Sequence, residues 1–268
     1  MGAAVGRRLT EHGVEVLTTL AARSPESAER AAAAGMQTVP FEQLADAELV
    51  LSIVPPAVAV PFAEQMVPCL RAAHRKPVFV DCNAVSPTTA QRIATLIEAT
   101  GTPFADAGII GPPPRAQGAQ PSIYASGQHA ARVAVLRDHG LDIRVIDAPI
   151  GAASALKMSF AGITKGVIAV VTAMTLAAAR AGATKQLHTE LGEREPALLA
   201  AMNRKIPDML PKAYRWVAEM QEISQFATPE GAGNLYAGAS QIYERVARAM
   251  ASDAAELEAL RSFFAAGG

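Results

Sequence analysis

The stretch "MGAAVGRRLTEHGVEVL" (residues 1–17) combines a glycine, a short amphipathic helix and the start of an apolar run. In a dinucleotide-binding βαβ unit, a strand enters a G-x-G-x-x-G turn, and the next helix directs its N-terminus at the pyrophosphate. Residues 1–17 match only the later part of that unit, with Gly2 as the third glycine, residues 3–11 as the helix and Gly13 as its terminator. We therefore expect a Rossmann-like α/β domain that lacks its first strand.

The composition is that of a globular chain without an electrostatic preference for polyanions. The chain has 268 residues, of which 50% are hydrophobic and 18% charged, enough for one large domain or two modest ones. A formal net charge of -1 and 5% aromatic residues argue against nucleic acid and against an anionic membrane surface. We expect no nucleic-acid partner.

Cysteine and histidine usage indicates neither a disulfide framework nor a metal site. Cys69 and Cys82 have no paired spacing, and the five histidines show no ligand spacing. The N-terminus lacks the basic-then-apolar layout of a signal peptide. These observations predict a cytoplasmic protein without a structural metal.

One apolar stretch, residues 162–179, is long enough to resemble a membrane span. It is built mostly from Ala, Val, Ile and Thr, with Lys157 and Lys165 near one end and Arg180 at the other. A buried helix of a protein outside the membrane is the better interpretation.

The first half alternates apolar strands with capped helices, which is typical of a parallel α/β sheet. Ser24 and Ser86 are predicted helix N-caps, each followed by proline, and Gly35 and Gly101 are predicted terminators. The predicted strands are residues 14–20, 48–54, 78–81, 102–111, 122–126 and 141–147.

The pattern changes near Pro149, beyond which no strand is predicted. "GAASALKMSFAGITKGVIAVVTAMTLAAARAG" (151–182) indicates one long helix ended by Gly182, and further helices follow, one through residues 213–227. We predict a dinucleotide-binding domain at residues 1–149 and an all-α domain at residues 150–268.

The end of the second predicted strand bears on cofactor choice. NAD sites place Asp or Glu there for the ribose hydroxyls, whereas a nearby Arg accommodates the 2′-phosphate of NADP. "TTLAARSPES" has no acid before Arg23, and Ser24 follows at a helix start. This favours NADP(H) over NAD, although Arg23 is equally consistent with an ordinary surface arginine beside an N-cap.

Three further motifs resemble those of the β-hydroxyacid dehydrogenase superfamily, which includes 3-hydroxyisobutyrate and 6-phosphogluconate dehydrogenases. They are "VLSIVPP" (50–56), "DCNAVSP" (81–87) and "GAASALK" (151–157), and the likeness is closest to the 6-phosphogluconate-dehydrogenase-like branch. The resemblance implies an N-terminal strand and glycine turn that residues 1–17 lack. It further implies cofactor contacts by Val54 and Pro55, cofactor and substrate contacts by Asn83, and a homodimer through the helical domain.

The resemblance makes Lys157 the catalytic residue, since a lysine in apolar surroundings can exchange the hydroxyl proton during hydride transfer. An arbitrary helix lysine would instead extend into solvent. Relatives carry Asn one turn later, where this chain has Ala161; Thr164 or Lys165 could substitute, though a buried Thr and a surface Lys are the simpler interpretations.

Two other segments depart from the family or match it loosely. In "FADAGIIGPPPR" (104–115), Gly111 matches a family glycine of the substrate site, but Ile110 and Pro112 replace a Ser and a Gly. In "YRWVAEMQEI" (214–223), the spacing of Trp216, Glu219 and Met220 predicts a core stripe, whereas the resemblance makes these residues part of the substrate pocket.

The leading hypothesis is an NADP(H)-dependent oxidoreductase acting on a small β-hydroxy acid or related carbonyl compound, with imine reduction as a variant of it. The replacements at Ile110, Pro112 and Ala161 favour a second hypothesis, a non-catalytic dinucleotide-binding protein. A third is that the chain binds no dinucleotide, because its first strand and phosphate turn are missing.

Overall fold

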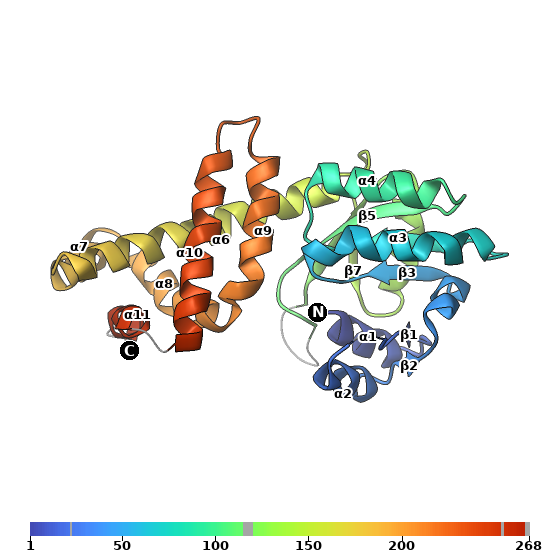
Figure 1. Cartoon of the computed structure of the whole chain (residues 1–268), viewed down its shortest axis with the longest axis horizontal. Coiled ribbons are helices and arrows are strands. Elements are labelled where there is room, and N and C mark those ends of the chain that lie inside the picture. The colour runs from blue at the N-terminus through green and yellow to red at the C-terminus, as the bar shows by residue number, and fades with distance from the viewer. Residues whose placement is uncertain (22, 115–119, 253–254, 266–268) are drawn as a thin grey trace. The chain divides into compact units, whose positions relative to one another are not determined.

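The computed structural model describes residues 1–21, 23–114, 120–252 and 255–265, and the chain forms two compact units, Met1–Met158 and Ser159–Gly268. The first is a Rossmann-like α/β domain and the second is helical, as predicted (Figure 1). The division lies after Met158, inside helix α6 (Ala152–Arg180), and not at residue 149. The reason is that the first turns of α6 pack on strand β5.

The first unit is built on a five-stranded sheet of order β3-β4-β5-β6-β7. Strands β3, β4 and β5 are parallel, β6 is antiparallel to β5, and β7 is parallel to β6. The bounds are β3 (Leu49–Ser52), β4 (Val78–Asp81), β5 (Phe104–Ile110), β6 (Ser122–Ser126) and β7 (Asp142–Val145). All four residues of β4 are buried, as expected of a strand covered on both faces.

Alternate residues of the sheet form two separate cores. Val50, Phe79 and Phe104 pack in one cluster with side chains of helices α3 (Pro56–Ala72) and α4 (Pro87–Glu98). Val78 and Val80 belong to the other cluster, which contains side chains of α1 (Gly2–Thr10) and α5 (Ala130–Val133). Short 3-10 helices at Phe41–Asp46 and Ala134–Arg137 complete the unit.

The predicted helix boundaries are confirmed. Ser86 caps α4, its hydroxyl accepting from the N–H of Thr89 at 3.2 Å, and Ser24 occupies the N-cap position of α2 (Pro25–Ala33). Gly35 and Gly101 adopt φ of 70° and 80°, the left-handed conformation that favours glycine after a helix.

A second, smaller sheet contains only β1 (Leu17–Thr18) and β2 (Gln37–Thr38), which pair in parallel. The predicted strand at residues 14–20 is thus reduced to two residues. The sheet of β1 and β2 is not joined to β3. Within the described residues, β1 and β3 each pair with a neighbouring strand on one side only.

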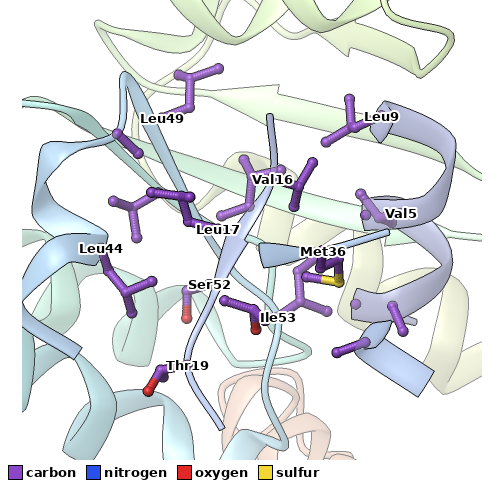
Figure 2. Close-up of a pocket in the computed structure, with 18 of the residues that line it drawn as sticks. Val5, Leu9, Val16, Leu17, Thr19, Met36, Leu44, Leu49, Ser52 and Ile53 are labelled. Atoms are coloured by element: carbon purple, nitrogen blue, oxygen red, sulfur yellow. The ribbon is translucent and has the colours of Figure 1, made fainter. Parts of the chain in front are cut away.

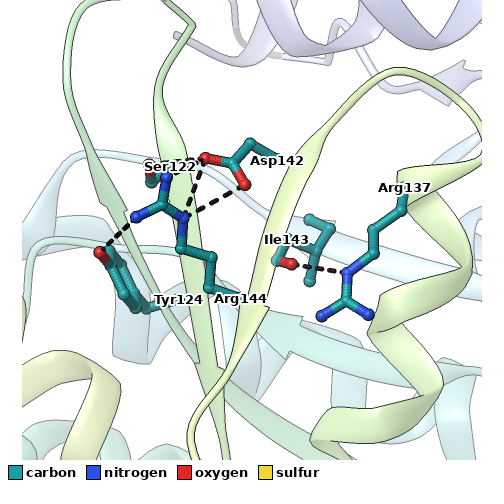
Figure 3. Close-up of polar contacts among 6 residues, drawn as sticks. All are labelled: Ser122, Tyr124, Arg137, Asp142, Ile143 and Arg144. Carbon is teal, nitrogen blue, oxygen red and sulfur yellow. Dashed lines mark hydrogen bonds and ion pairs between the residues drawn. The ribbon is translucent and has the colours of Figure 1, made fainter.

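The far edge of the large sheet, β7, carries polar contacts (Figure 3). Arg144 pairs with Asp142 at 2.9 Å and donates to the Tyr124 hydroxyl at 3.1 Å, while Ser122 donates to Asp142 at 2.7 Å. Charged side chains of this kind protect a sheet edge from pairing with other chains.

The second unit contains the remainder of α6 and five further α-helices within its described residues. Their bounds are α7 (Thr184–Arg194), α8 (Pro196–Met209), α9 (Ala213–Phe226), α10 (Gly233–Ser252) and α11 (Ala255–Ala265), with a 3-10 turn at Leu210–Lys212. Helices α9 and α10 pack together, and the rings of Trp216 and Tyr243 meet edge to face at 5.1 Å.

Helix α6 is buried on one face only. Among the described residues it is the one helix with the length and composition of a membrane span, but only 39% of its most apolar window is buried. The expectation of a buried helix therefore holds for one face of α6 and not for the other. Within the second unit the exposed face carries apolar side chains three and four residues apart, namely Phe160, Ile163, Val167, Val170 and Met174.

Candidate active site

The carboxyl ends of the parallel strands form the candidate site of the first unit. In open α/β sheets, ligands bind at this edge, where the loops that follow the strands converge. β3 ends at Ser52 and continues into Val54 and Pro55, and β4 ends at Asp81, directly before Asn83. The register aligns Ser52 with Asp81, so these loops start side by side.

Asn83 joins the ends of β3 and β4. It is buried, its Oδ1 accepts from the N–H of Val54 at 2.7 Å, and its Nδ2 donates to the hydroxyl of Ser52 at 2.9 Å and to the carboxylate of Asp81. Both ends of the amide are thereby used within the protein. The structure gives Asn83 a positioning role toward Val54, and its predicted contacts with cofactor and substrate remain predictions.

A buried carboxylate holds the start of α6 on the sheet. Asp106 of β5 is fully buried and accepts hydrogen bonds from the N–H groups of Gly151 and Ser154 at 2.9 and 3.0 Å. The hydroxyls of Ser154 and Ser126 donate to the same carboxylate at 2.6 and 3.1 Å. The first N–H groups of a helix have no partner inside it, and an anion satisfies them while interacting favourably with the helix dipole.

Two glycines allow this close approach. A Cβ on Gly108 would lie 2.7 Å from the carbonyl oxygen of Ala153 and 3.0 Å from the Cβ of Lys157. Gly151 has φ of 102°, which other residues rarely adopt, and it makes the turn into α6. The positive φ of Gly151 therefore explains why "GAASALK" begins with glycine, independently of any family resemblance.

Lys157 lies where α6 crosses β5. Its Nζ donates to the carbonyl of Ile109 at 2.5 Å, near the carboxyl end of that strand. This position is fixed by the contacts of Asp106 and Gly108, which hold the first turns of α6 against the sheet. The structure thus brings the predicted catalytic lysine to the edge where ligands of such folds bind.

Between β1 and β3 lies a groove of about 820 Å³ (Figure 2). Side chains of α1, β1 and β3 line it, and Met1 and Gly2 lie at its rim, with Gly2 near Ile53. A Cβ on Gly2 would make only ordinary contacts, 3.8 Å from Ile53, whereas one on Gly6 would lie 2.7 Å from the sulfur of Met36. Close packing of α1 thus requires glycine at position 6 and not at position 2.

The predicted phosphate residues lie at the start of α2. Arg23 lines the groove, and Ser24 is exposed, with its hydroxyl 3.2 Å from that of Ser27. Arg30 donates to the Ser27 hydroxyl at 2.8 Å, which directs a second guanidinium toward the helix start. Ser27 and Arg30 were not predicted from the sequence, although the three-residue spacings Ser24–Ser27 and Ser27–Arg30 are a helical signal.

The remaining substrate residue of this unit, Gly111, follows β5 with φ of 121°, and a Cβ there would lie 3.0 Å from Cα of Pro121. Nearby, the pKa of the Cys82 thiol is raised well above its ordinary value by burial and by the carboxylates of Asp81 and Asp106. Cys82 is therefore a protonated core side chain at neutral pH. Among the described residues, no group of three or more side chains that commonly ligate metals is found.

In the helical unit, Lys165 and Glu219 form a buried ion pair. The side chains are 17% and 8% exposed, and the Lys165 ammonium lies 4.9 Å from the centre of the Trp216 ring. Tyr243 donates to the carbonyl of Lys165 at 2.5 Å, and burial and then Glu219 raise the pKa of its hydroxyl. The prediction of a surface position for Lys165 is wrong, because Glu219 and Trp216 compensate its burial.

The three residues of α9 that were predicted to form a core stripe or a substrate pocket differ in burial. Met220 is fully buried in the core, so the core interpretation is correct for it and a substrate contact is not supported. Oε1 of Glu219 is buried and makes no hydrogen bond. Trp216 is partly exposed, so a substrate contact by Trp216 or Glu219 stays a prediction.

Asp106 with its serine partners in the first unit and the Lys165–Glu219 pair in the helical unit were also not predicted from the sequence. The signal for Asp106 was present, since an acid inside the apolar run "FADAGII" must find donors when buried. No local signal connects Lys165 with Glu219, because the two are far apart in the chain and only tertiary packing joins them.

Comparison with known proteins places these features in context. Residues 1–138 match the family model described as the NAD binding domain of 6-phosphogluconate dehydrogenase, and residues 178–246 match a domain of unknown function, DUF1932. The chain is 29% identical over 184 residues to an uncharacterized 28.5 kDa protein from the 7S RNA 5′ region of Methanothermus fervidus, covering 68% of this chain and 69% of that protein.

Solved structures extend the similarity over almost the whole chain. The conserved protein MTH1747, of unknown function and structurally similar to 3-hydroxyacid dehydrogenases, has 30% identity and a TM-score of 0.69, covering 94% of this chain and 95% of its own. 3-Hydroxyisobutyrate dehydrogenase of Mycobacterium tuberculosis, solved with L-serine, has 20% identity and a TM-score of 0.71, covering 100% and 96%. At that identity the second match shows the fold alone.

Proposed function

The chain belongs to the β-hydroxyacid dehydrogenase superfamily, and from this we propose that it is an NADP(H)-dependent oxidoreductase for a small β-hydroxy acid or a related carbonyl compound. Membership supports an oxidoreductase with a nicotinamide dinucleotide cofactor. The observation that carries the proposal is the position of Lys157, at the carboxyl edge of the sheet and hydrogen-bonded to Ile109.

The residues at the groove rim fit the phosphate-bearing end of the cofactor. Arg23 and Arg30 supply two guanidinium groups, and Ser27 supplies a hydroxyl, at a helix start whose N–H groups favour anions. The first turn of α1, beginning at Gly2, would face the pyrophosphate from the other side of the groove. Val54, held by Asn83, and Pro55 would lie along the bound nicotinamide half.

Lys157 is assigned the proton transfer. A nicotinamide cofactor, when bound, would take up the hydride from the carbinol carbon or supply it to the carbonyl carbon. As a neutral amine, Lys157 takes the hydroxyl proton during oxidation; as an ammonium ion, it polarises the carbonyl and returns the proton during reduction. The bond to Ile109 uses one Nζ donor and orients the group, since an ammonium ion has three donors. We propose substrate contacts for Gly111, Trp216 and Glu219.

We further propose a cytoplasmic homodimer through the helical unit. The exposed apolar face of α6, from Phe160 to Met174, repeats at spacings of three and four residues, the pattern that packs against another helix. Exposed apolar stripes of this kind mark association surfaces. Analytical ultracentrifugation of Ile163→Glu, whose side chain is 67% exposed, tests it. We expect the variant to be monomeric, with native circular dichroism.

The catalytic proposal is tested with the Lys157→Ala variant. NADPH oxidation is followed over a panel of aldehydes, keto acids and imines, and we expect kcat to fall about 100-fold or more, the usual contribution of a general acid. Lys185→Ala, at an exposed position of α7, is the matched control and should retain activity. The dissociation constant of NADPH should not change in either variant, which separates chemistry from binding.

Two results would change the assignment. Activity that survives Lys157→Ala unchanged removes this residue from the mechanism. Binding of NADPH without turnover on the whole panel would favour a non-catalytic dinucleotide-binding protein.

Preference for NADPH is tested by the variants Arg23→Ala and Arg30→Ala. Each should weaken the binding of NADPH relative to that of NADH by about tenfold. The control variant Arg204→Ala, at an exposed position, should leave the ratio of the two affinities unchanged.

A further inference from the structure

The Lys165–Glu219 pair is a buried polar site of the helical unit. Helix α6 supplies Lys165 and helix α9 supplies Glu219, and their side chains are 17% and 8% exposed. Burial costs both charges their hydration, and apolar residues of similar volume often stabilise a fold as well as such a pair or better. A contribution to stability is therefore a weak explanation for these two residues.

One oxygen of Glu219 has no donor. Oε2 accepts from the Lys165 ammonium, whereas Oε1 is buried and makes no hydrogen bond to any described residue. A buried carboxylate oxygen without a donor has lost its hydration and gained nothing in return. A ligand that donates a hydrogen bond to Oε1 would recover this loss.

The hydroxyl of Tyr243 does not serve as this donor. It lies close enough to Glu219 for the carboxylate to raise its pKa, in addition to the larger effect of burial. Its one proton is donated to the carbonyl of Lys165 at 2.5 Å, and the raised pKa keeps that proton in place at neutral pH. Tyr243 therefore holds α6 beside α10 and leaves Oε1 unsatisfied.

Lys165 has hydrogen-bonding capacity to spare as well. An ammonium ion has three N–H donors, and the side chain makes one hydrogen bond to the described residues, to Glu219. The ammonium lies 4.9 Å from the centre of the Trp216 ring, and Trp216 is partly exposed. A donor and an acceptor are thus available side by side, next to an aromatic ring that a ligand can approach.

Charge decides which group suits this pair. Lys165 and Glu219 are neutral together, so an anion near Lys165 is repelled by Glu219, and a cation near Glu219 is repelled by Lys165. A charged ligand would also lose hydration in these partly buried surroundings. A neutral group with both a donor and an acceptor avoids these costs, since its N–H or O–H reaches Oε1 and its oxygen accepts from Lys165.

A rotation of the carboxylate gives such a group access. The last torsion of a glutamate side chain has a broad energy minimum, so Oε1 can turn toward a ligand while Oε2 stays beside Lys165. The exposed part of the Trp216 ring supplies an apolar contact for the carbon chain of the ligand.

We propose that Lys165 and Glu219, beside Trp216, bind a neutral hydrogen-bonding group of the substrate, a primary carboxamide or a hydroxyl. They select it over a carboxylate or an ammonium group at the same position. This inference rests on the proposed function, in which Trp216 and Glu219 are substrate contacts, and adds the chemical class that they recognise. Lys165 becomes a specificity-determining residue.

The test measures binding without cofactor. Trp216 is the only tryptophan of the chain, so its fluorescence reports on this site directly. The probes are propionamide, 1-propanol, propionate and propylammonium, which differ in charge but little in size. We expect saturable binding of the two neutral probes in about the millimolar range, the limit for such small ligands, and binding of the charged probes about tenfold weaker or less.

A paired variant tests the two side chains together. Lys165→Met/Glu219→Leu removes both charges, so that neither is left buried alone, and circular dichroism checks its fold. Propionamide should bind to it about tenfold more weakly. The control Arg194→Met/Glu190→Leu removes an exposed ion pair of α7 and should leave the affinity unchanged.

A single variant tests the role of charge. Glu219→Gln replaces the carboxylate by an amide and leaves the pair with a net positive charge. It should reverse the selectivity, so that propionate binds more tightly than propionamide. A pair that only joined α6 to α9 would show no reversal.

Three results overturn the proposal: equal affinities for the four probes, no saturable response to any of them, or propionamide binding that the paired variant leaves unchanged. The proposed dehydrogenase activity is judged separately, because these measurements use neither cofactor nor turnover. Selective probe binding without turnover on the substrate panel would remove the dehydrogenase proposal and keep this site. Turnover that depends on Lys157, without probe selectivity, would do the opposite.

Discussion

The two sheets of the first unit differ in the length and the burial of their strands. β4 has a neighbour on each side, and all four of its residues are buried. β1 has one neighbour, forms only two paired residues, and leaves both partly exposed. A strand of a parallel sheet is stabilised by what lies on both of its edges and faces, so apolar composition alone does not fix its length.

The largest expected effect concerns Asp106 in β5 of the five-stranded sheet. Asp106→Ala removes the acceptor of hydrogen bonds from Gly151, Ser154 and Ser126 and leaves buried donors without partners. We expect a loss of about 3–5 kcal/mol of unfolding free energy, as for a broken buried network. Urea unfolding measures it. A loss below about 1 kcal/mol would show that Asp106 does not hold α6 on the sheet.

The next effect tests the close approach of α6. Gly108→Ala puts a Cβ 2.7 Å from the carbonyl oxygen of Ala153, a contact that backbone movement must relieve, and we expect destabilisation of about 2–3 kcal/mol. Gly238→Ala, inside α10 with nothing within 4 Å, is the matched control and should stabilise the protein by about 0.5–1 kcal/mol. Equal effects of the two substitutions would contradict the packing assigned to Gly108.

The same substitution in both sheets compares them directly. Val80→Ala in fully buried β4 should cost about 2–3 kcal/mol, because a cavity remains among packed neighbours. Val16→Ala beside the groove should cost less than about 1 kcal/mol, because that side chain is partly exposed. Similar costs of the two substitutions would contradict the difference in packing between β1 and β4.

The smallest expected effect on stability concerns Asp142 in β7, the terminal strand opposite β3. Hydrogen bonds from Arg144 and then from Ser122 lower the pKa of Asp142 below its ordinary value of 3.8. A carboxyl group with a lowered folded-state pKa stabilises the protein above its unfolded pKa and loses that contribution as pH falls through the folded value. Since both side chains are more than a third exposed, Asp142→Asn should cost well under about 1 kcal/mol at neutral pH, less in high salt, and progressively less as the pH falls through the lowered pKa. Thermal melts against pH measure it.

Much of the fold and part of the site were predictable. Serine caps with a following proline, and glycines after helices, are local signals, and they located α2 and α4 correctly. The spacing of Gly151 and Lys157 predicted a lysine on the first turns of the long helix, and the structure places it against β5. Burial of Met220 followed from its helical spacing, as the core interpretation stated.

By itself, the sequence determined the α/β-then-helical order and the helix boundaries, because these depend on periodicity, caps and glycines within a few residues of each other. Only the tertiary structure decided that Asp106 holds α6, that Asn83 ties two strand ends, and that Lys165 finds Glu219. Those contacts join residues distant in the chain, and each depends on burial that makes an unpaired polar group costly.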